Sequence, residues 1–506
     1  MAKWVIGIDL STTTCKAIAW DERGAQVAQG RAPLSLSRPG ANAYEQAPED
    51  WWQAAQAALR QLAVLIDMRQ VAALAVVNQR ETVAVTDAND QVLRPALLWL
   101  DERRKAEVDG LAGAVGQERL HQLSGKPHDW APAILSLAWM ARHEPQLFEQ
   151  IRHVYDPHAW LVRQLTGAFA TSWASADPFG AFDIHRHQWS EDVLQALPVA
   201  LPVDCFAPAS APGTLLGTVH RAAAQATGLR PGTPVMAGGG DGQAGGLGVG
   251  VAAPGVAYLN LGTAIVSGVY SQLPSISQAF RTMCAVDSQG YVLETSLRSG
   301  TLLVNSLLRQ FFDIDAAAEP ERLLALEKAA ADVAPGSAGL ILLPYWSGMM
   351  NPYWDQDARG CLLGLSPDHG RAEIYRALLE GIALEQAVAT RAVVAATGQP
   401  VDAFVAIGGG ASSRLWCQII ANVTDRPVVR AVSQEASSLG AGIAAAVGAG
   451  WYADFASAAA AMTQGGETFT PDPALRDFHR ELLALYSDLY PRLRDLYPRL
   501  ALLNRR

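Results

Sequence analysis

Residues 4–21 read WVIGIDLSTTTCKAIAWD, and this stretch decides the fold. It contains an apolar strand that ends at Asp9, a turn of small hydroxyl side chains, and a second apolar strand. A polar turn at residues 21–24 then precedes a third strand. The pattern predicts an antiparallel ladder of three strands at the start of an α/β domain.

The same plan returns in the second half of the chain. Residues 255–270, GVAYLNLGTAIVSGVY, form an apolar strand, a small-residue turn at Gly262-Thr263, and a second apolar strand. Two similar units about half a chain apart indicate a duplicated α/β domain. The glycine- and proline-rich stretch after Asp241 is the natural boundary, which predicts domains at residues 1–243 and 244–506.

Composition narrows the class of protein. The 506 residues are long enough for two large domains, and half of them are hydrophobic. With 39 basic and 49 acidic residues the net charge is -10. The sequence has no run of like charges that would indicate binding to nucleic acid or to an anionic membrane. The five cysteines lie far apart, which fits neither a disulfide framework nor a zinc site. We therefore expect a cytoplasmic protein, since the N-terminus also lacks the pattern of a signal peptide.

One uncharged stretch resembles a membrane span but is better explained otherwise. Residues 242–280 contain no charged side chain, yet repeated glycines would interrupt a spanning helix. Helices are predicted elsewhere, from Pro48 onward with acids in the first turn, over residues 371–396, and over residues 474–500 as an outer element. We assign no chemistry to these helices.

The first turn is a candidate phosphate cradle. Asp9 ends its strand and is followed by hydroxyl side chains, while a lysine lies nearby as a counter-charge. The candidate residues are Asp9, Ser11, Thr12, Thr13 and Lys16. The alternative is that these side chains only cap a hairpin turn.

Two glycine turns are candidates for nucleotide binding. At Gly262-Thr263 a glycine lets the backbone approach a ligand closely. In AIGGGASSRLWCQ, Gly408, Gly409 and Gly410 follow a strand and precede a helix that Ser412 or Ser413 can cap. The alternative for the glycine triplet is a tight turn that needs unusual backbone angles.

Asp241 is the best candidate for a catalytic residue. It stands alone among glycines in MAGGGDGQAGGLG, which favours a strained loop that presents one carboxylate. In phosphoryl transfer such a carboxylate accepts the proton of the attacking hydroxyl, beside a divalent metal that neutralises phosphate charge. Asp9 and Asp241 are together candidates to face that metal.

A polar block between two apolar strands is a candidate sugar site. Residues 78–81, NQRE, place Arg80 beside Glu81, and an adjacent base and acid can bind several hydroxyls in a fixed geometry. PALLWLDERR adds Trp99, Asp101 and Arg103, an aromatic face with charged groups nearby. The alternative for each group is an ion pair at the surface of a hairpin.

The order of these motifs resembles the FGGY family of carbohydrate kinases over nearly the whole chain. An Asp-led phosphate loop, NQRE, GGGD, LGT and GGG follow one another in the family's order. Residues 344–386, PYWSGMMNPYWDQDARGCLLGLSPDHGRAEIYRALLEGIALEQ, resemble its most recognisable stretch.

This resemblance implies two ribonuclease H-like domains of the actin-like ATPase type with an active-site cleft between them. It implies ATP and Mg²⁺ as cofactors and Asp241 as the base. Residues 9–13 and the turn Gly262-Thr263 would hold phosphates, and Gly300, residues 408–410 and Ser413 would line the nucleotide. Arg80 and Glu81 would bind substrate hydroxyls, with Trp99 at the family's aromatic position.

The motifs point to two subfamilies for the substrate. GGGDGQAG and the LWxDxR pattern of Asp101 and Arg103 resemble xylulokinases, whereas NQRE resembles glycerol kinases. Ser11 stands where the family usually has Gly, and SGKPHDWAP lacks the tyrosine expected for glycerol. We expect a ketopentose such as xylulose, with glycerol or another short polyol as the alternative, and a non-catalytic relative of the actin-like ATPases as a further one. A homodimer is also possible for such a protein.

Overall fold

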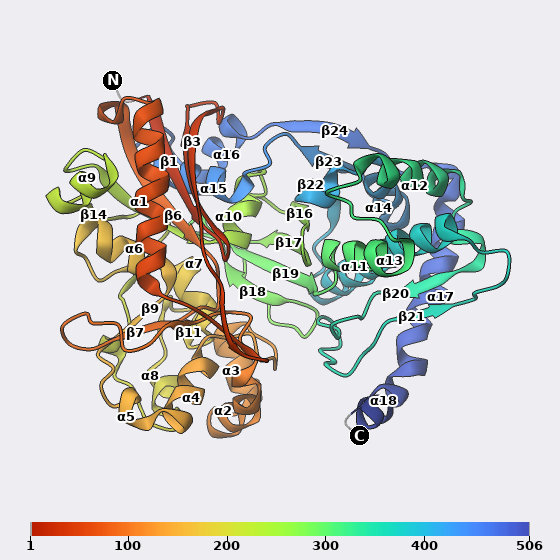
Figure 1. The fold of residues 1–506 in the computed structure, drawn as a ribbon, viewed down its shortest axis with the longest axis horizontal. Coiled ribbons are helices and arrows are strands. Elements are labelled where there is room, and N and C mark those ends of the chain that lie inside the picture. The colour runs from red at the N-terminus through yellow and green to blue at the C-terminus, as the bar shows by residue number, and fades with distance from the viewer. Residues whose placement is uncertain (1–2, 505–506) are drawn as a thin grey trace.

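Two large mixed sheets form the frame of the molecule. The computed structural model describes residues 3–504, and Figure 1 shows the two sheets in separate lobes. The first sheet has the order β14-β15-β6-β1-β2-β3. Its strands are β1 (Trp4–Leu10), β2 (Thr14–Trp20), β3 (Gln26–Pro33), β6 (Val71–Asn78), β14 (Leu215–Thr218) and β15 (Pro234–Gly240).

The second sheet follows the order β18-β19-β17-β16-β22-β23-β24. Its strands are β16 (Gly255–Leu261), β17 (Ile265–Ser271), β18 (Arg281–Cys284), β19 (Tyr291–Leu297), β22 (Val401–Ile407), β23 (Val428–Ala431) and β24 (Gly465–Phe469). Six neighbouring strands of each sheet correspond in order and direction, β3-β2-β1-β6-β15-β14 in the first and β19-β17-β16-β22-β23-β24 in the second. This confirms the predicted duplicated α/β architecture.

The duplication extends to the register of single residues. β1 is antiparallel to β2 and parallel to β6, and β16 is antiparallel to β17 and parallel to β22. Both parallel pairings carry an irregularity after the first residue of the strand, at Trp4 and at Gly255. Asp9 and Asn260 are the next-to-last residues of these strands and therefore occupy equivalent positions.

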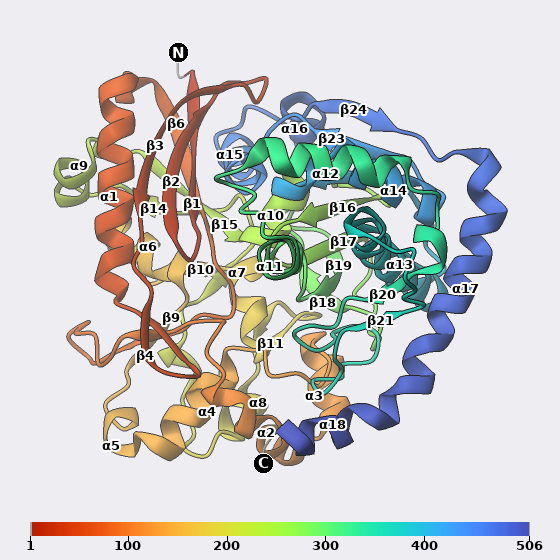
Figure 2. The ribbon, with the colours of Figure 1, turned by 45° about the vertical axis from the view of Figure 1, so that its right-hand side comes forward.

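Helices cover the two sheets. On the first sheet α1 (Pro48–Leu65) packs against β2 and β3, while α15 (Ala436–Gly448) packs against β1, β6 and β15. The second lobe carries α11 (Thr301–Phe312), α13 (Arg371–Thr397), α14 (Arg414–Thr424) and α17 (Arg476–Leu493). The predicted helices from Pro48 and over residues 371–396 are confirmed, and Figure 2 shows α17 at the outer edge. Since α15 comes from the second half, the boundary at residue 243 stays a prediction.

The glycine-rich stretch around Asp241 is not the strained loop that was predicted. It forms the end of β15 and the helix α10 (Asp241–Leu247). The glycines permit close packing, because a Cβ on Gly238 would lie 1.9 Å from the Val76 carbonyl oxygen and one on Gly248 would lie 1.9 Å from that of Ala436. Gly238 thus lets β15 lie close to β6, and Gly248 lets the end of α10 lie close to α15.

The chain also contains no candidate for a membrane-spanning element within residues 3–504, since no helix there combines the necessary length with sufficient apolar character.

Candidate active site

Asp241 lies where β15 passes into α10. Its Oδ1 accepts a hydrogen bond from its neighbour Gly242 N at 2.7 Å and lies 3.3 Å from Nε of Arg80. The side chain keeps 37% of its surface exposed, so a substrate can reach it. Desolvation in the site raises the pKa of Asp241, and Glu81 adds to this effect while Arg80 opposes it. A carboxylate with a raised pKa is a better proton acceptor, which suits a general base.

Asp9 provides a second carboxylate in this region. The residue is 8% exposed, and its Oδ1 is buried without a hydrogen-bond partner in the described part of the chain. Burial first, and the charge of Asp241 next, raise the pKa of Asp9 to about 7. A buried carboxylate oxygen without a partner beside a second carboxylate fits a divalent cation.

The protein alone would give such a cation few ligands. Among residues 3–504 no group of three or more His, Cys, Asp and Glu side chains is arranged to hold a metal ion. Mg²⁺ commonly binds through one or two carboxylates together with water and substrate phosphate oxygens. The pair Asp9 and Asp241 fits that pattern.

Lys16 forms an ion pair with a residue that the sequence did not single out. Its Nζ lies 2.5 Å from Oε2 of Glu435, the residue just before α15. Glu435 therefore joins the second half of the chain to β2, the strand that follows the hydroxyl turn of the first half. No local motif marked this glutamate, because its partner lies 419 residues away in the sequence.

The hydroxyl turn is connected to the predicted sugar block. The Thr12 hydroxyl donates to Gln79 Oε1 at 3.0 Å and accepts from Trp99 Nε1 at 2.9 Å. The Ser11 hydroxyl donates to the Thr14 carbonyl at 2.9 Å and so closes the turn, whereas Thr13 is exposed. The capping alternative thus describes Ser11, and Thr12 links the hydroxyl turn to Trp99.

The NQRE block is a buried network and not a surface ion pair. Arg80 NH1 lies 2.9 Å from Oε2 of Glu294, and Arg281 NH1 lies 3.0 Å from Oε1 of Glu81. Arg281 also pairs with Glu294. A continuous chain of charges therefore runs from Asp241 through Arg80, Glu294 and Arg281 to Glu81.

The second half of the molecule supplies two members of this network. Arg281 begins β18 and Glu294 lies in β19, where Tyr258 also donates to Glu294 at 3.1 Å. Sequence reasoning missed both residues. The only signal in the sequence was that Glu294 is a charged residue within an apolar strand. Its partner Arg80 lies 214 residues away, so the sequence does not indicate the pairing.

Trp99 and Asp101 differ in what they can offer a ligand. The Trp99 side chain is 39% exposed and presents its ring beside Thr12. Asp101 is buried, and its carboxylate accepts from Arg103 NH2 at 2.6 Å and from the Tyr44 amide at 2.9 Å. Contacts with protein groups thus occupy Asp101, and its role in substrate binding stays a prediction.

The predicted nucleotide residues lie together at the ends of the second sheet. Gly300 N donates to the Thr263 carbonyl at 3.0 Å, so Gly300 adjoins the turn Gly262-Thr263. Gly408 has a φ of +83°, and a Cβ there would lie 2.5 Å from Asn260 Oδ1. Ser413 caps α14 by accepting from Trp416 N at 3.2 Å. The structure thus brings Gly262, Thr263, Gly300, Gly408, Gly409, Gly410 and Ser413 into one region.

Comparison with known proteins identifies the family. The N-terminal domain of the FGGY family of carbohydrate kinases matches residues 4–248, and its C-terminal domain matches residues 257–449. This chain belongs to the FGGY family of carbohydrate kinases. The FGGY kinase is 35% identical over 428 residues to xylulose kinase of Escherichia coli (strain K12), which covers 83% of this chain and 84% of that protein.

Two further comparisons cover almost the entire FGGY kinase. It is 30% identical over 511 residues to autoinducer-2 kinase of Klebsiella pneumoniae subsp. pneumoniae, with 96% of this chain and 93% of that protein covered. The crystal structure of xylulose kinase from Rhodospirillum rubrum aligns with a TM-score of 0.91 and 29% identity over 98% of this chain and 100% of that chain. The predicted actin-like fold and the enzyme class, a sugar kinase that uses ATP, are therefore confirmed.

Proposed function

We propose that this FGGY kinase phosphorylates a neutral ketopentose such as xylulose, with Asp241 as the general base. The observation that carries the proposal is the buried chain of alternating charges that ends at the accessible carboxylate of Asp241. Alternating donors and acceptors suit the hydroxyls of a sugar, which both donate and accept hydrogen bonds. The relatedness to xylulose kinases supports the same choice.

The charge balance of the network favours a neutral sugar over a sugar acid. Arg80 and Arg281 are opposed by Glu81 and Glu294, and Asp241 adds a further negative charge. A substrate carboxylate would meet no excess of cations there, and burying it without a partner is costly. A neutral polyhydroxyl chain avoids this cost.

The reaction follows from the position of Asp241. A substrate hydroxyl beside Asp241 loses its proton to the carboxylate as its oxygen attacks the γ-phosphorus of ATP. The bond between that phosphorus and the β,γ-bridging oxygen breaks, and ADP leaves. Arg80 holds Oδ1 of Asp241 and is therefore a positioning residue for the base.

The phosphates are assigned to the two equivalent turns. Residues 9–13 and the turn Gly262-Thr263 would bind them, while Gly300, residues 408–410 and Ser413 would line the nucleoside. Thr13, Thr263 and Gly409 are exposed in these turns, which supports this assignment. Mg²⁺ held by Asp9 and Asp241 would neutralise charge on the β- and γ-phosphates.

Glycerol or another short polyol is the second candidate. Arg80 and Glu81 in the NQRE block resemble the substrate residues of glycerol kinases, and both are in the buried network. A coupled assay of ADP release over D-xylulose, other ketopentoses, tetritols, gluconate and glycerol separates the candidates. We expect no ADP release above background without an acceptor, and the highest kcat/KM for a ketopentose, about 100-fold above glycerol. A preference for gluconate or glycerol would overturn the assignment.

A further inference from the structure

A second polar cluster bridges the two halves near the NQRE block. Asp129 is buried, and its Oδ1 accepts from Arg298 NH2 and from Gln356 Nε2, each at 3.2 Å. Arg298 and Gln356 belong to the second half of the chain. Oδ2 of Asp129 is also buried and has no hydrogen-bond partner within residues 3–504. A buried carboxylate oxygen in this state indicates a donor supplied from outside the protein.

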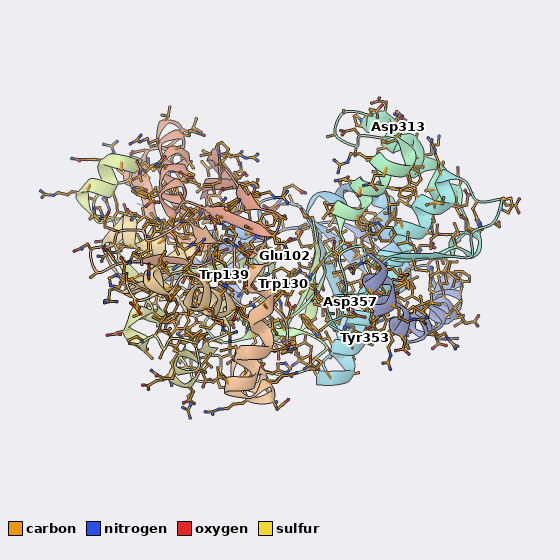
Figure 3. All side chains as sticks on the ribbon, turned by 60° about the horizontal axis from the view of Figure 1, so that its bottom comes forward. Glu102, Trp130, Trp139, Asp313, Tyr353 and Asp357 are labelled. Carbon is orange, nitrogen blue, oxygen red and sulfur yellow. The ribbon has the colours of Figure 1, made fainter. Side chains whose placement is uncertain are left out.

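Trp130 is the aromatic centre of the cluster. The guanidinium carbons of Arg298 and Arg104 lie 4.9 Å and 5.4 Å from its ring centroid, and the Lys105 ammonium lies 4.8 Å away. Its Nε1 is 3.4 Å from Gln356 Oε1. Figure 3 shows Trp130 at the junction of the two lobes, towards the segment that carries Asp357. Cation–π contacts of the Trp130 ring with these three side chains, of which Arg298 comes from the second half, therefore stabilise the contact between the two halves.

Arg104 connects this cluster to the active site. Its NH1 donates to the Glu81 carbonyl at 3.0 Å and its NH2 donates to the Trp99 carbonyl at 2.8 Å. Its Nε is buried, with no acceptor among the residues described, and the same holds for Nε of Arg281. Burial lowers the pKa of Arg104 to about 10, and Glu81 and Asp129 only partly offset the effect.

The polar groups thus form a path of contacts from the base to this cluster. It starts at Asp241 and Arg80 and reaches Glu81 through Glu294 and Arg281. From the Glu81 carbonyl it continues through Arg104 and the Trp130 ring to Arg298, which pairs with Asp129. Donor and acceptor groups without protein partners lie in its far part. A three-carbon acceptor held at Asp241 would leave these groups unsatisfied, whereas a longer chain can reach them.

We propose that Asp129, Arg104 and Arg298 form a distal subsite that binds the hydroxyls at the end of the acceptor remote from the phosphorylated one, and so selects acceptors of five or more carbons. This inference rests on the proposed function. The sugar hydroxyl donates to Oδ2 of Asp129 and accepts from the guanidinium N–H groups. Because Arg298 comes from the second half, the subsite is complete only where both halves meet.

The competing explanation is that Asp129 and Arg298 merely hold the halves together. The variant Asp129→Asn distinguishes the structural explanation from the subsite. Its amide keeps one oxygen that can accept from Arg298 but replaces the second carboxylate oxygen, the proposed acceptor of the sugar hydroxyl, with an NH₂ group. Asp109→Asn is the matched control, since Asp109 pairs with His128 in the same region but its side chain is 96% exposed.

The experiment measures kcat/KM of wild type and both variants for D-xylulose and for glycerol, together with KM for ATP and the melting temperature. We expect Asp129→Asn to lower kcat/KM for xylulose at least tenfold through KM, with a change below threefold for glycerol. Asp109→Asn is expected to match the wild type. Equal losses on both acceptors, or no loss on either, would overturn the subsite.

Failure of the ketopentose assignment would show separately, in the wild-type acceptor panel. If the wild type prefers another acceptor of five or six carbons, kcat/KM for that acceptor is compared with kcat/KM for glycerol in wild type and Asp129→Asn. This comparison then tests the subsite. A wild type that prefers glycerol would contradict the subsite directly.

Discussion

The ends of β6 and β22 occupy equivalent places in the two halves but carry opposite chemistry. Asp9 pairs with Val77 on β6, and Asn260 pairs with Ile407 on β22. After Val77 come the polar residues 78–81, of which Asn78, Gln79 and Glu81 are buried, while Ile407 is followed by three glycines. One half therefore presents charged side chains, and the other presents bare backbone.

Under the proposed assignment, this difference lets one fold serve two ligands. A sugar is recognised by side-chain donors and acceptors in fixed positions, which the network of Arg80 and Glu81 would supply. A nucleotide phosphate is held at close range by backbone amides, for which glycine leaves room. The equivalent residues of β1 and β16 show the same contrast. Asp9 on β1 can bind a cation, whereas Asn260 on β16 lies against the glycine Gly408.

The largest expected effect comes from the base that lies at the junction of the two halves. Asp241→Asn keeps the size of the side chain but removes the proton acceptor, so we expect kcat to fall about 1,000-fold. Binding of ATP is expected to change less than threefold, because the residues proposed to line the nucleoside, Gly300, residues 408–410 and Ser413, do not include Asp241. Coupled assays of ADP release and calorimetric titration with ATP measure the two quantities. Turnover at the wild-type level in this variant would remove Asp241 from its role.

A smaller effect is expected in the glycine turn of the second half. A Cβ on Gly409 would meet no atom within 4 Å, so Gly409→Ala leaves the fold intact and obstructs the nucleotide. We expect KM for ATP to rise about fivefold with unchanged KM for sugar and unchanged melting temperature. Gly408→Ala is expected to lower the melting temperature as well, because its φ is +83° and its Cβ would collide with Asn260.

Gly113→Ala is the control for these substitutions, since Gly113 is exposed and a Cβ there would also meet no atom within 4 Å. It is expected to match the wild type in both KM values. If Gly409→Ala instead weakened sugar and ATP equally, the separation of the two ligand sites would be wrong.

Local patterns in the sequence predict the parts of the fold that are determined locally. The strand and turn around Asp9, the helix from Pro48 and the cap at Ser413 each depend on neighbouring residues, and each forms as predicted. The repeated strand–turn–strand pattern predicts the duplication for the same reason. The glycines around Asp241 mislead, because the need for close packing of α10 and α15 arises only in the tertiary structure.

Long-range ion pairs could not be predicted from the sequence. Glu435 binds Lys16, and Glu294 binds Arg80, across separations of 419 and 214 residues. A single charged residue in an apolar strand does not disclose its partner. Asp101 shows the converse, since its pattern suggested a ligand contact but its carboxylate is occupied by Arg103.

Separate binding measurements on Arg80→Lys test the proposed division between the charged network and the glycine turn most directly. Lysine keeps the charge but cannot contact Glu294 and Asp241 with the same fork of donors. Calorimetric titration with xylulose and with a non-hydrolysable ATP analogue gives one dissociation constant for each ligand. We predict that the constant for sugar rises at least tenfold while the constant for the ATP analogue changes less than twofold. Equal weakening of both ligands, in a variant that keeps the wild-type melting temperature, would contradict the assignment of the sugar to the charged network of Arg80 and of the nucleoside to the glycine turn at residues 408–410.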